Sequence, residues 1–185
     1  MASGNSRRFG KNKLLEEING KKLYLYGLEK LALIKDKHCK VIIVSQYSEI
    51  LSAAENMGFT AVYSPDSIYG ASYTVKNGIK SIENITQEDY LIFMVADQPY
   101  LSLNSIEKLL SAAETGADIA RLYCGEIPGN PVLFSAKYVP ELLNLSGDQG
   151  GGALVKKYGC SKVEIGDIKE LSDIDTAEDL QNAAQ

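Results

Sequence analysis

Short, uninterrupted apolar runs that alternate with helical patterns constrain the fold of this chain more than any other feature. Runs with no intervening polar residue are typical of strands that are buried on both faces of a sheet. Such runs lie at residues 41–44 (VIIV), 60–63 (TAVY) and 91–95 (LIFMV). Apolar residues spaced three and four positions apart, which mark one face of a helix, recur within 24–31, 75–82 and 106–113. This alternation predicts βαβ units and an α/β fold with a mostly parallel sheet.

The rest of the chain continues the same pattern. Further strands are predicted at 118–124, 131–135 and 161–165, and further helices at 136–144, 149–158 and 176–184. Asp175 and Glu178 have the spacing of a capping box for the last of these helices. The 185 residues contain no internal repeat, low-complexity tract or linker, so we expect residues 1–185 to form a single domain.

Composition argues against several classes of function. The net charge of −5 provides no basic field for nucleic acid, and no apolar run approaches the roughly 18 residues that a membrane span needs. The first residues are polar rather than those of a secretory signal, and three widely spaced cysteines favour a reducing, cytoplasmic location. A single histidine and no Cys-x-x-Cys motif argue against zinc, whereas a magnesium site built from carboxylates remains open.

Polar residues follow the apolar runs at the edge of the sheet where ligands bind in open α/β folds. Asp97 comes directly after the run 91–95 and Ala96, and Ser45 follows the run 41–44. A carboxylate at the end of a central strand is partly desolvated, so it needs a partner. A magnesium ion carrying nucleotide phosphates would supply one. A turn or helix-cap aspartate is the alternative, and position alone leaves both open.

The segment MASGNSRRFGKNK (1–13) combines glycines with basic side chains. Gly4 and Gly10 can supply positive φ angles and let backbone N–H groups approach an anion. The spacing matches neither a P-loop nor a dinucleotide-binding loop. On composition alone, a phosphate-binding loop and a polar, frayed terminus both remain possible.

Five segments in order resemble the motifs of the MobA-like nucleotidyltransferases, with molybdenum cofactor cytidylyltransferases as the most similar branch. They are MASGNSRRFGKNKLL (1–15), YGASYTVKNGI (69–79), VADQPYLS (95–102), GNPVLFSAKYVPELLNLSGDQGGG (129–152) and DIDTAEDL (173–180). The resemblance implies a three-layer, Rossmann-like α/β fold whose mostly parallel sheet contains one antiparallel strand. It also implies transfer of a nucleoside monophosphate from an NTP to a molybdopterin-type phosphate, with Mg²⁺ as cofactor and pyrophosphate as the second product.

The resemblance assigns a role to individual residues. Arg8 and Lys13 would hold the triphosphate and act with Asp97 in catalysis. The nucleotide would bind to Ala2, Ser3, Gly4, Arg8, Lys13 and Ser72, and the metal to Asp97 and Asp148. Ser72 has an alternative role as a helix cap, and Asp173 and Asp175 fit a cap better than catalysis. Relatives carry Ala or Gly where Ser3 stands, so a narrower space and an added hydroxyl predict CTP over GTP.

Departures from the motifs keep two other functions open. Gly152 stands where arginine often follows the acidic position, and Asn130 stands where many relatives have histidine. One alternative is a non-catalytic nucleotide or cofactor carrier, which would deliver its cargo to a molybdoenzyme. The other is a nucleotidyltransferase that acts on a sugar phosphate. Relatives also have about six apolar residues before the glycine loop, where this sequence has Met1 and Ala2, so we expect a truncated first central strand.

Overall fold

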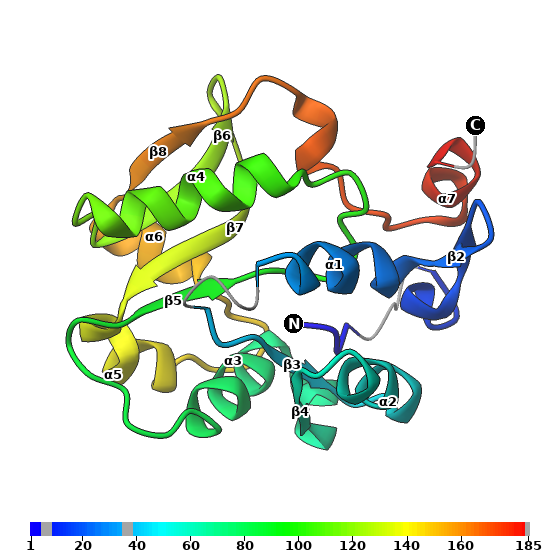
Figure 1. The fold of residues 1–185 in the computed structure, drawn as a ribbon, viewed down its shortest axis with the longest axis horizontal. Helices are drawn as coiled ribbons and strands as arrows, with labels where there is room; N and C mark the ends of the chain where they lie inside the picture. The colour runs from blue at the N-terminus through cyan, green and yellow to red at the C-terminus, as the bar shows by residue number, and fades with distance from the viewer. Residues whose placement is uncertain (5–8, 35–38, 184–185) are drawn as a thin grey trace.

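A four-stranded sheet forms the centre of the fold (Figure 1). The computed structural model describes residues 1–4, 9–34 and 39–183. The strands, in spatial order, are β5 (Tyr90–Phe93), β7 (Ile127–Ser135), β6 (Ile119–Cys124) and β8 (Ser161–Glu164). β7 is antiparallel to both β5 and β6, whereas β6 and β8 are parallel. The one antiparallel strand that the resemblance implied for this sheet is therefore β7.

The predicted single, mostly parallel sheet is instead divided into three hydrogen-bonded units. β3 (Ile42–Ser45) pairs in parallel with β4 (Thr60–Tyr63), and β1 (Glu17–Ile18) forms a short hairpin with β2 (Lys21–Lys22). The α/β class is confirmed and β7 is the one antiparallel strand of the central sheet, but the prediction of a single continuous sheet was wrong. The reason is that residues 1–2, which lie between β3 and the segment after β5, bond to both but form no strand there to join the two units.

The first residues lie between β3 and the segment that follows β5. The backbone N–H of Ala2 donates to the carbonyl of Val44 at 2.9 Å, and that of Ala96 donates to the carbonyl of Met1 at 3.1 Å. These bonds on both sides place residues 1–2 in the position expected for the end of a first central strand. The adjoining space is a small cavity of about 20 Å³ that Leu28 and Met94 help to line.

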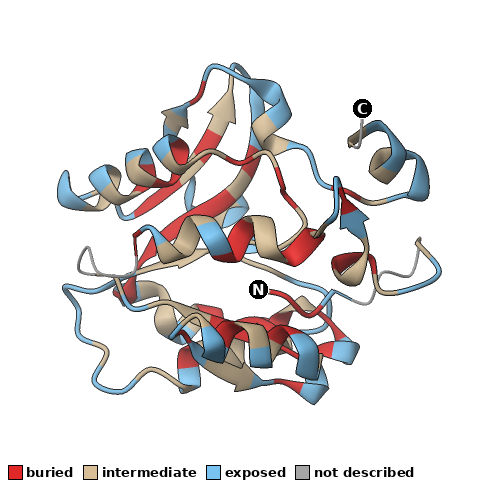
Figure 2. Cartoon of the chain, turned by 45° about the vertical axis from the view of Figure 1, so that its right-hand side comes forward, coloured by how far each residue is buried: buried red, intermediate tan, exposed pale blue. Residues whose placement is uncertain are grey.

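Helices cover both faces of the central sheet, which gives three layers. Successive residues of β7 show this, because Leu133 packs with Ile106 and Leu109 of α4 (Leu103–Glu114). Val132 and Phe134 point to the opposite face, where the helices are α3 (Ala71–Lys80), α5 (Val139–Leu143) and α6 (Gly152–Tyr158). The remaining helices are α1 (Leu23–Ala32), α2 (Ser48–Asn56) and α7 (Ala177–Ala183). Figure 2 shows the buried residues on the strands and on the inward sides of the helices.

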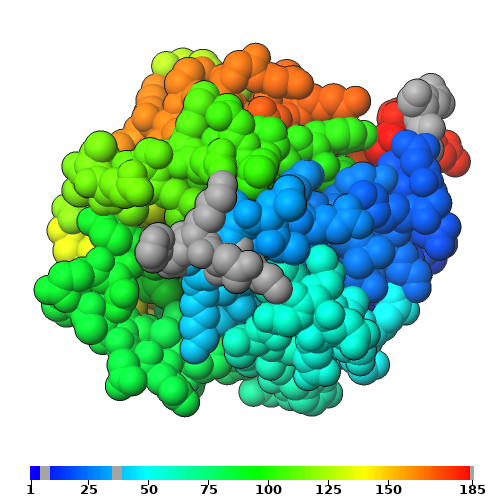
Figure 3. Space-filling model, in the orientation of Figure 1, coloured from blue at the N-terminus to red at the C-terminus, as the bar shows by residue number. Residues whose placement is uncertain are grey.

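Tertiary position, rather than local pattern, decides two elements that the sequence analysis missed or misjudged. α2 was not predicted, although Ile50 and Ala54 on its inner side are completely buried. β4 was predicted to be buried on both faces, but Thr60 is exposed and the side chain of Tyr63 is 65% exposed. β4 pairs only with β3 among the described strands, so it is an edge strand. In the space-filling view α1 and α4 lie across one face of the molecule (Figure 3).

Four short 3-10 turns complete the described structure, at Lys13–Leu15, Pro65–Tyr69, Ala136–Tyr138 and Ile168–Leu171. Among the described residues, no helix is long and apolar enough to cross a membrane.

Candidate active site

A cavity of about 340 Å³ opens where the N-terminal segment meets the chain beyond β5. Its walls come from segments that are far apart in the sequence. They include Ser3, Gly4, Lys13, Ser67, Gly70, Thr74, Asp97, Asp148 and Asp175. The cavity therefore collects most of the described residues that the sequence analysis assigned to nucleotide and metal.

The turn after β3 holds the start of the glycine loop. The amide of Gln46 donates to the carbonyl of Ser3 at 2.8 Å, and the hydroxyl of Tyr47 donates to the carbonyl of Gly4 at 2.9 Å. The positive φ expected for glycine is present at Gly10, at 79°, but not at Gly4. A Cβ added to Gly4 would meet no atom within 4 Å, so this glycine leaves open space at the cavity wall.

Ser3 does not present its hydroxyl hydrogen to the cavity. Its Oγ donates to the carbonyl of Val44 at 3.1 Å, and the residue is only 5% exposed. The hydrogen of the hydroxyl that the sequence adds at this position is therefore bonded to β3. Ser3 still lines the cavity, and its effect on the choice of base stays a prediction.

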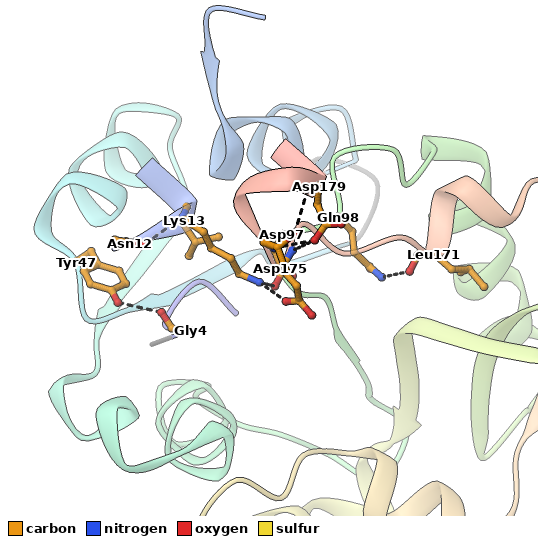
Figure 4. Close-up of polar contacts among 11 residues, drawn as sticks. Gly4, Asn12, Lys13, Tyr47, Asp97, Gln98, Leu171, Asp175 and Asp179 are labelled. Carbon is orange, nitrogen blue, oxygen red and sulfur yellow. Dashed lines mark hydrogen bonds and ion pairs between the residues drawn. The ribbon is translucent and has the colours of Figure 1, made fainter. Parts of the chain in front are cut away.

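Lys13 lies between two carboxylates. Asn12 caps the 3-10 turn that carries it, because its side-chain oxygen accepts from the N–H of Leu14 at 3.1 Å. The Lys13 Nζ is 2.6 Å from Asp97 Oδ2 and 2.8 Å from Asp175 Oδ1, with the side chain only 8% exposed (Figure 4). Desolvation lowers the pKa of Lys13, but the two carboxylates outweigh this effect and raise it overall. The amine is therefore held in its charged form.

Asp97 has one oxygen that Lys13 contacts and one oxygen that has no partner among the described residues. Its Oδ1 is buried and has no hydrogen-bond partner among the described residues. A buried, unpartnered carboxylate oxygen is costly unless a cation or donor reaches it. The unpartnered oxygen means that Lys13 satisfies only part of this carboxylate, which fits a site that also receives a divalent cation, because hard cations take carboxylate ligands.

Asp175 was interpreted as a helix cap, and the structure shows a different arrangement. The cap of α7 is formed by Thr176 and Asp179, since Asp179 Oδ2 accepts from the N–H of Thr176 at 2.7 Å. Thr176 Oγ1 in turn accepts from the N–H of Asp179 at 3.1 Å. The capping box lies one residue later than predicted, which leaves the Asp175 side chain turned toward Lys13. A Thr-x-x-Asp spacing in the sequence was the signal for this register.

Asp173 lies near the same carboxylates, although the residue as a whole is exposed. Desolvation of its carboxyl group, followed by the charges of Asp97 and Asp175, raises the pKa of Asp173 to about 6. Lys13 and a hydrogen bond from Gln98 act in the opposite direction. At this end of the cavity, the three carboxyl groups of Asp97, Asp173 and Asp175 therefore outnumber the one described side-chain ammonium group near them, that of Lys13.

Asp148 reaches the cavity on a turn that is attached to the start of α3. The N–H of Ser72 donates to the carbonyl of Gly147 at 3.1 Å. A Cβ on Gly70 would overlap that same carbonyl oxygen, and Gly70 has a φ of 139°. Only glycine combines this backbone angle with so close an approach. The contact sets the position of Asp148, which is itself exposed.

Neither proposed role of Ser72 is matched by its position. Ser72 is completely buried, its Oγ has no partner among the described residues, and it is not part of the cavity wall. It does not cap α3, whose N-cap is Gly70. Thr74 and Ser67 line the cavity instead and share a hydrogen bond of 2.7 Å. Both were missed, and Thr74 belongs to the quoted segment 69–79.

The other predicted residues are placed as follows. Ala2 is buried and pairs with β3 rather than lining the cavity. Arg8 lies outside the described residues. Gly152 begins α6 and is not part of the cavity wall.

The carboxylates do not make a complete metal cage. Within the described residues, no group of three or more His, Cys, Asp and Glu side chains is arranged to hold an ion. Magnesium is usually held by one or two carboxylates together with substrate phosphates and water. Asp97 and Asp175 both contact the Lys13 ammonium group, so their oxygens lie close together. Two such carboxylates fit an ion that arrives with a phosphate ligand.

Comparisons with known proteins find relatives that match almost the whole chain. Purine catabolism protein PucB from Bacillus subtilis (strain 168) is 27% identical over 193 residues, which cover 97% of this chain and 91% of PucB. The structure of Rv0371c from Mycobacterium tuberculosis H37Rv superposes with a TM-score of 0.79 at 18% identity, covering 99% of this chain and 94% of that one. Rv0371c has also been crystallised with manganese.

A protein of molybdopterin-guanine dinucleotide biosynthesis, protein A from Archaeoglobus fulgidus, has the same fold. Its structure superposes with a TM-score of 0.70 at 17% identity and covers 99% of this chain and 94% of its own. Residues 1–163 match the MobA-like NTP transferase domain. Because that match spans most of the chain, the protein belongs to the MobA-like NTP transferase domain family.

Proposed function

We propose that this protein transfers a nucleoside monophosphate, CMP from CTP, to the phosphate of a molybdopterin-type cofactor and releases pyrophosphate. The observation that carries the proposal is the position of Lys13 between Asp97 and Asp175 on the wall of one cavity. A cation and two carboxylates at the end of a strand can hold a triphosphate and the metal that accompanies it.

The chemistry requires positioning more than covalent help. An oxygen of the acceptor phosphate attacks the α-phosphorus, the bond from that phosphorus to the β-bridging oxygen breaks, and pyrophosphate leaves with the electron pair. Lys13 and Arg8 would hold the phosphates that leave, and the N-terminal segment would orient the α-phosphate for in-line attack. No general base is needed, because the acceptor phosphate is already ionised at neutral pH.

The divalent ion has a place in this arrangement. We propose that Asp97 and Asp175 hold it, with Asp148 either completing the site or orienting the acceptor. When bound, the ion would neutralise charge on the phosphates and fix their geometry. The manganese complex of Rv0371c supports a divalent metal in this fold.

The acceptor and the base rest on separate support. A molybdopterin-type acceptor is supported by the sequence motifs and by the name of the A. fulgidus protein of the same fold. Cytidine is proposed because Ser3 lines the cavity at a position where a glycine would leave more room for a purine. A molybdoenzyme is the partner that we expect to receive the product.

Release of pyrophosphate tests the proposal. The assay supplies each of the four common NTPs with magnesium and a molybdopterin acceptor, and compares the wild-type protein with Asp97→Asn. We expect release that depends on acceptor and metal, that is fastest with CTP, and that Asp97→Asn removes. Release with a sugar phosphate but not with molybdopterin would favour the second acceptor class. Tight nucleotide binding with no release in any combination would favour a non-catalytic carrier.

A further inference from the structure

The two carboxylates that we assign to the metal already share a cation of the chain itself. The ammonium nitrogen of Lys13 is 2.6 Å from Asp97 and 2.8 Å from Asp175, so it occupies a point between them. Magnesium contacts carboxylate oxygens at about 2.1 Å. An ion bound to both oxygens would therefore need much the same position as the ammonium group.

The surroundings make it costly for Lys13 to leave this point. Its side chain is only 8% exposed, and Figure 4 shows it extended from the 3-10 turn toward both carboxylates. A buried ammonium that loses its partners pays a desolvation penalty. If Lys13 stayed in place, its charge would repel the incoming ion. A free divalent ion is therefore disfavoured in either case.

A triphosphate changes this balance. Its oxygens carry negative charge and can accept hydrogen bonds from the amine in place of the two carboxylates. Lys13 can then turn from Asp97 and Asp175 to the phosphates, which frees both oxygens for the metal.

We propose that Lys13 is an internal counter-ion that keeps free divalent metal out of the site until a triphosphate arrives. The inference rests on the proposed function, because it takes Asp97 and Asp175 as the metal ligands. Metal and triphosphate then bind cooperatively, and by linkage each strengthens the other to the same degree. Removing Lys13 should therefore strengthen the binding of the free metal ion and weaken the binding of the triphosphate.

Binding of Mn²⁺ in the absence of nucleotide tests this consequence. The free ion is measured by electron paramagnetic resonance with the wild-type protein and with Lys13→Met. We expect Lys13→Met to bind Mn²⁺ at least fivefold more tightly, the lower end of typical coupling between sites. We also expect it to bind CTP in the presence of Mn²⁺ more weakly than the wild type, as measured by equilibrium dialysis.

Lys11→Met is the matched control. Lys11 is two positions away and pairs with Glu16 at 2.6 Å, with 64% of its side chain exposed. It should leave Mn²⁺ affinity unchanged, which separates local exclusion from a general change in charge. Lys13→Gln serves as a second variant if Lys13→Met does not fold. Thermal unfolding shows whether each variant is folded.

The outcomes separate the two proposals. If Lys13→Met and Lys13→Gln bind free Mn²⁺ no more tightly than the wild type, the counter-ion proposal is wrong. If Asp97→Asn leaves Mn²⁺ binding to the Lys13→Met background unchanged, the metal assignment of the proposed function is wrong and the inference fails with it. A gain in Mn²⁺ affinity that Asp97→Asn abolishes supports both.

Discussion

The side-chain nitrogen of Lys13 lies 2.8 Å from Oδ1 of Asp175, although 162 positions separate the two residues in the chain. This contact joins the first quoted motif to the last. It brings the N-terminal segment and the residues just before α7 together at one cavity. It also gives the carboxylate of Asp175 a partner, although local spacing had assigned that side chain to a helix cap.

Asp175→Asn should separate the functional from the structural role of this region. The substitution keeps the shape of the side chain but removes the charge that faces Lys13, so we expect pyrophosphate release to fall about a hundredfold or more. Asp179→Asn is the control, because asparagine keeps an oxygen that can accept from the N–H groups of Thr176 and Asp175, so we expect a loss of no more than about 1 kcal/mol of stability and little change in rate. Wild-type rates for Asp175→Asn would show that Asp175 has no part in transfer.

Asp97→Ala should abolish turnover while leaving the protein folded. Its Oδ1 lacks a partner among the described residues, and Lys13, which contacts its Oδ2, keeps the second carboxylate of Asp175, so we expect the fold to persist. Loss of a charge contact in the transition state is worth roughly 3 kcal/mol, or a hundredfold or more in rate. Pyrophosphate release and circular dichroism check the two halves of this prediction, and retained activity would rule out the metal role.

Gly70→Ala should displace the turn that carries Asp148. The added methyl group would meet the carbonyl of Gly147, and the backbone angle is unfavourable for alanine. Gly116→Ala is the control, because Gly116 also has a positive φ, of 79°, but an added Cβ would meet nothing within 4 Å. We expect the larger fall in melting temperature and in activity for Gly70→Ala. Equal effects of the two variants would mean that the contact with Gly147 is not tight.

Glu170→Gln should lower stability in a manner that depends on pH. Glu170 Oε2 accepts from the N–H of Ser102, the N-cap of α4, at 2.8 Å. Desolvation raises the pKa of this carboxyl group, but hydrogen bonds from Ser105 and Ser102 outweigh it and leave the pKa below its usual 4.5. A lowered pKa stabilises the fold above the unfolded value and loses that effect as the pH falls through the folded value.

Chemical denaturation at several pH values tests this prediction. At pH 7 we expect Glu170→Gln to be less stable than the wild type by about 1 kcal/mol, the range for a partly exposed hydrogen bond to a charged group. The difference should shrink as the pH falls below 4.5. A difference that is the same at pH 7 and at low pH would mean that the charge of Glu170 does not contribute.

Most of the central elements followed from periodicity. The apolar runs predicted the positions of most strands, since a short continuous run between helical segments has few other stable arrangements. The strand at 60–63 and the start at 161 agree with the prediction, and the starts at 42, 90 and 119 agree within one residue. The strand-end position drew attention to Asp97, and the resemblance to the family motif drew attention to Lys13. Both line the cavity, and their roles in binding and catalysis stay predictions.

Tertiary structure decided what depends on partners distant in the chain. The edge position of β4 depends on which strands pair with it, and the sequence of residues 60–63 does not show that pairing. Asp175 became a site residue because the capping box formed at Thr176 and Asp179, which turned its side chain toward Lys13. Ser3 and Ser72 have hydroxyls whose uses are set by neighbours, one bonded to Val44 and the other buried outside the cavity. Sequence determined which side chains were available, and three-dimensional packing determined which of them face the same space, because contacts between remote segments form only when the layers assemble.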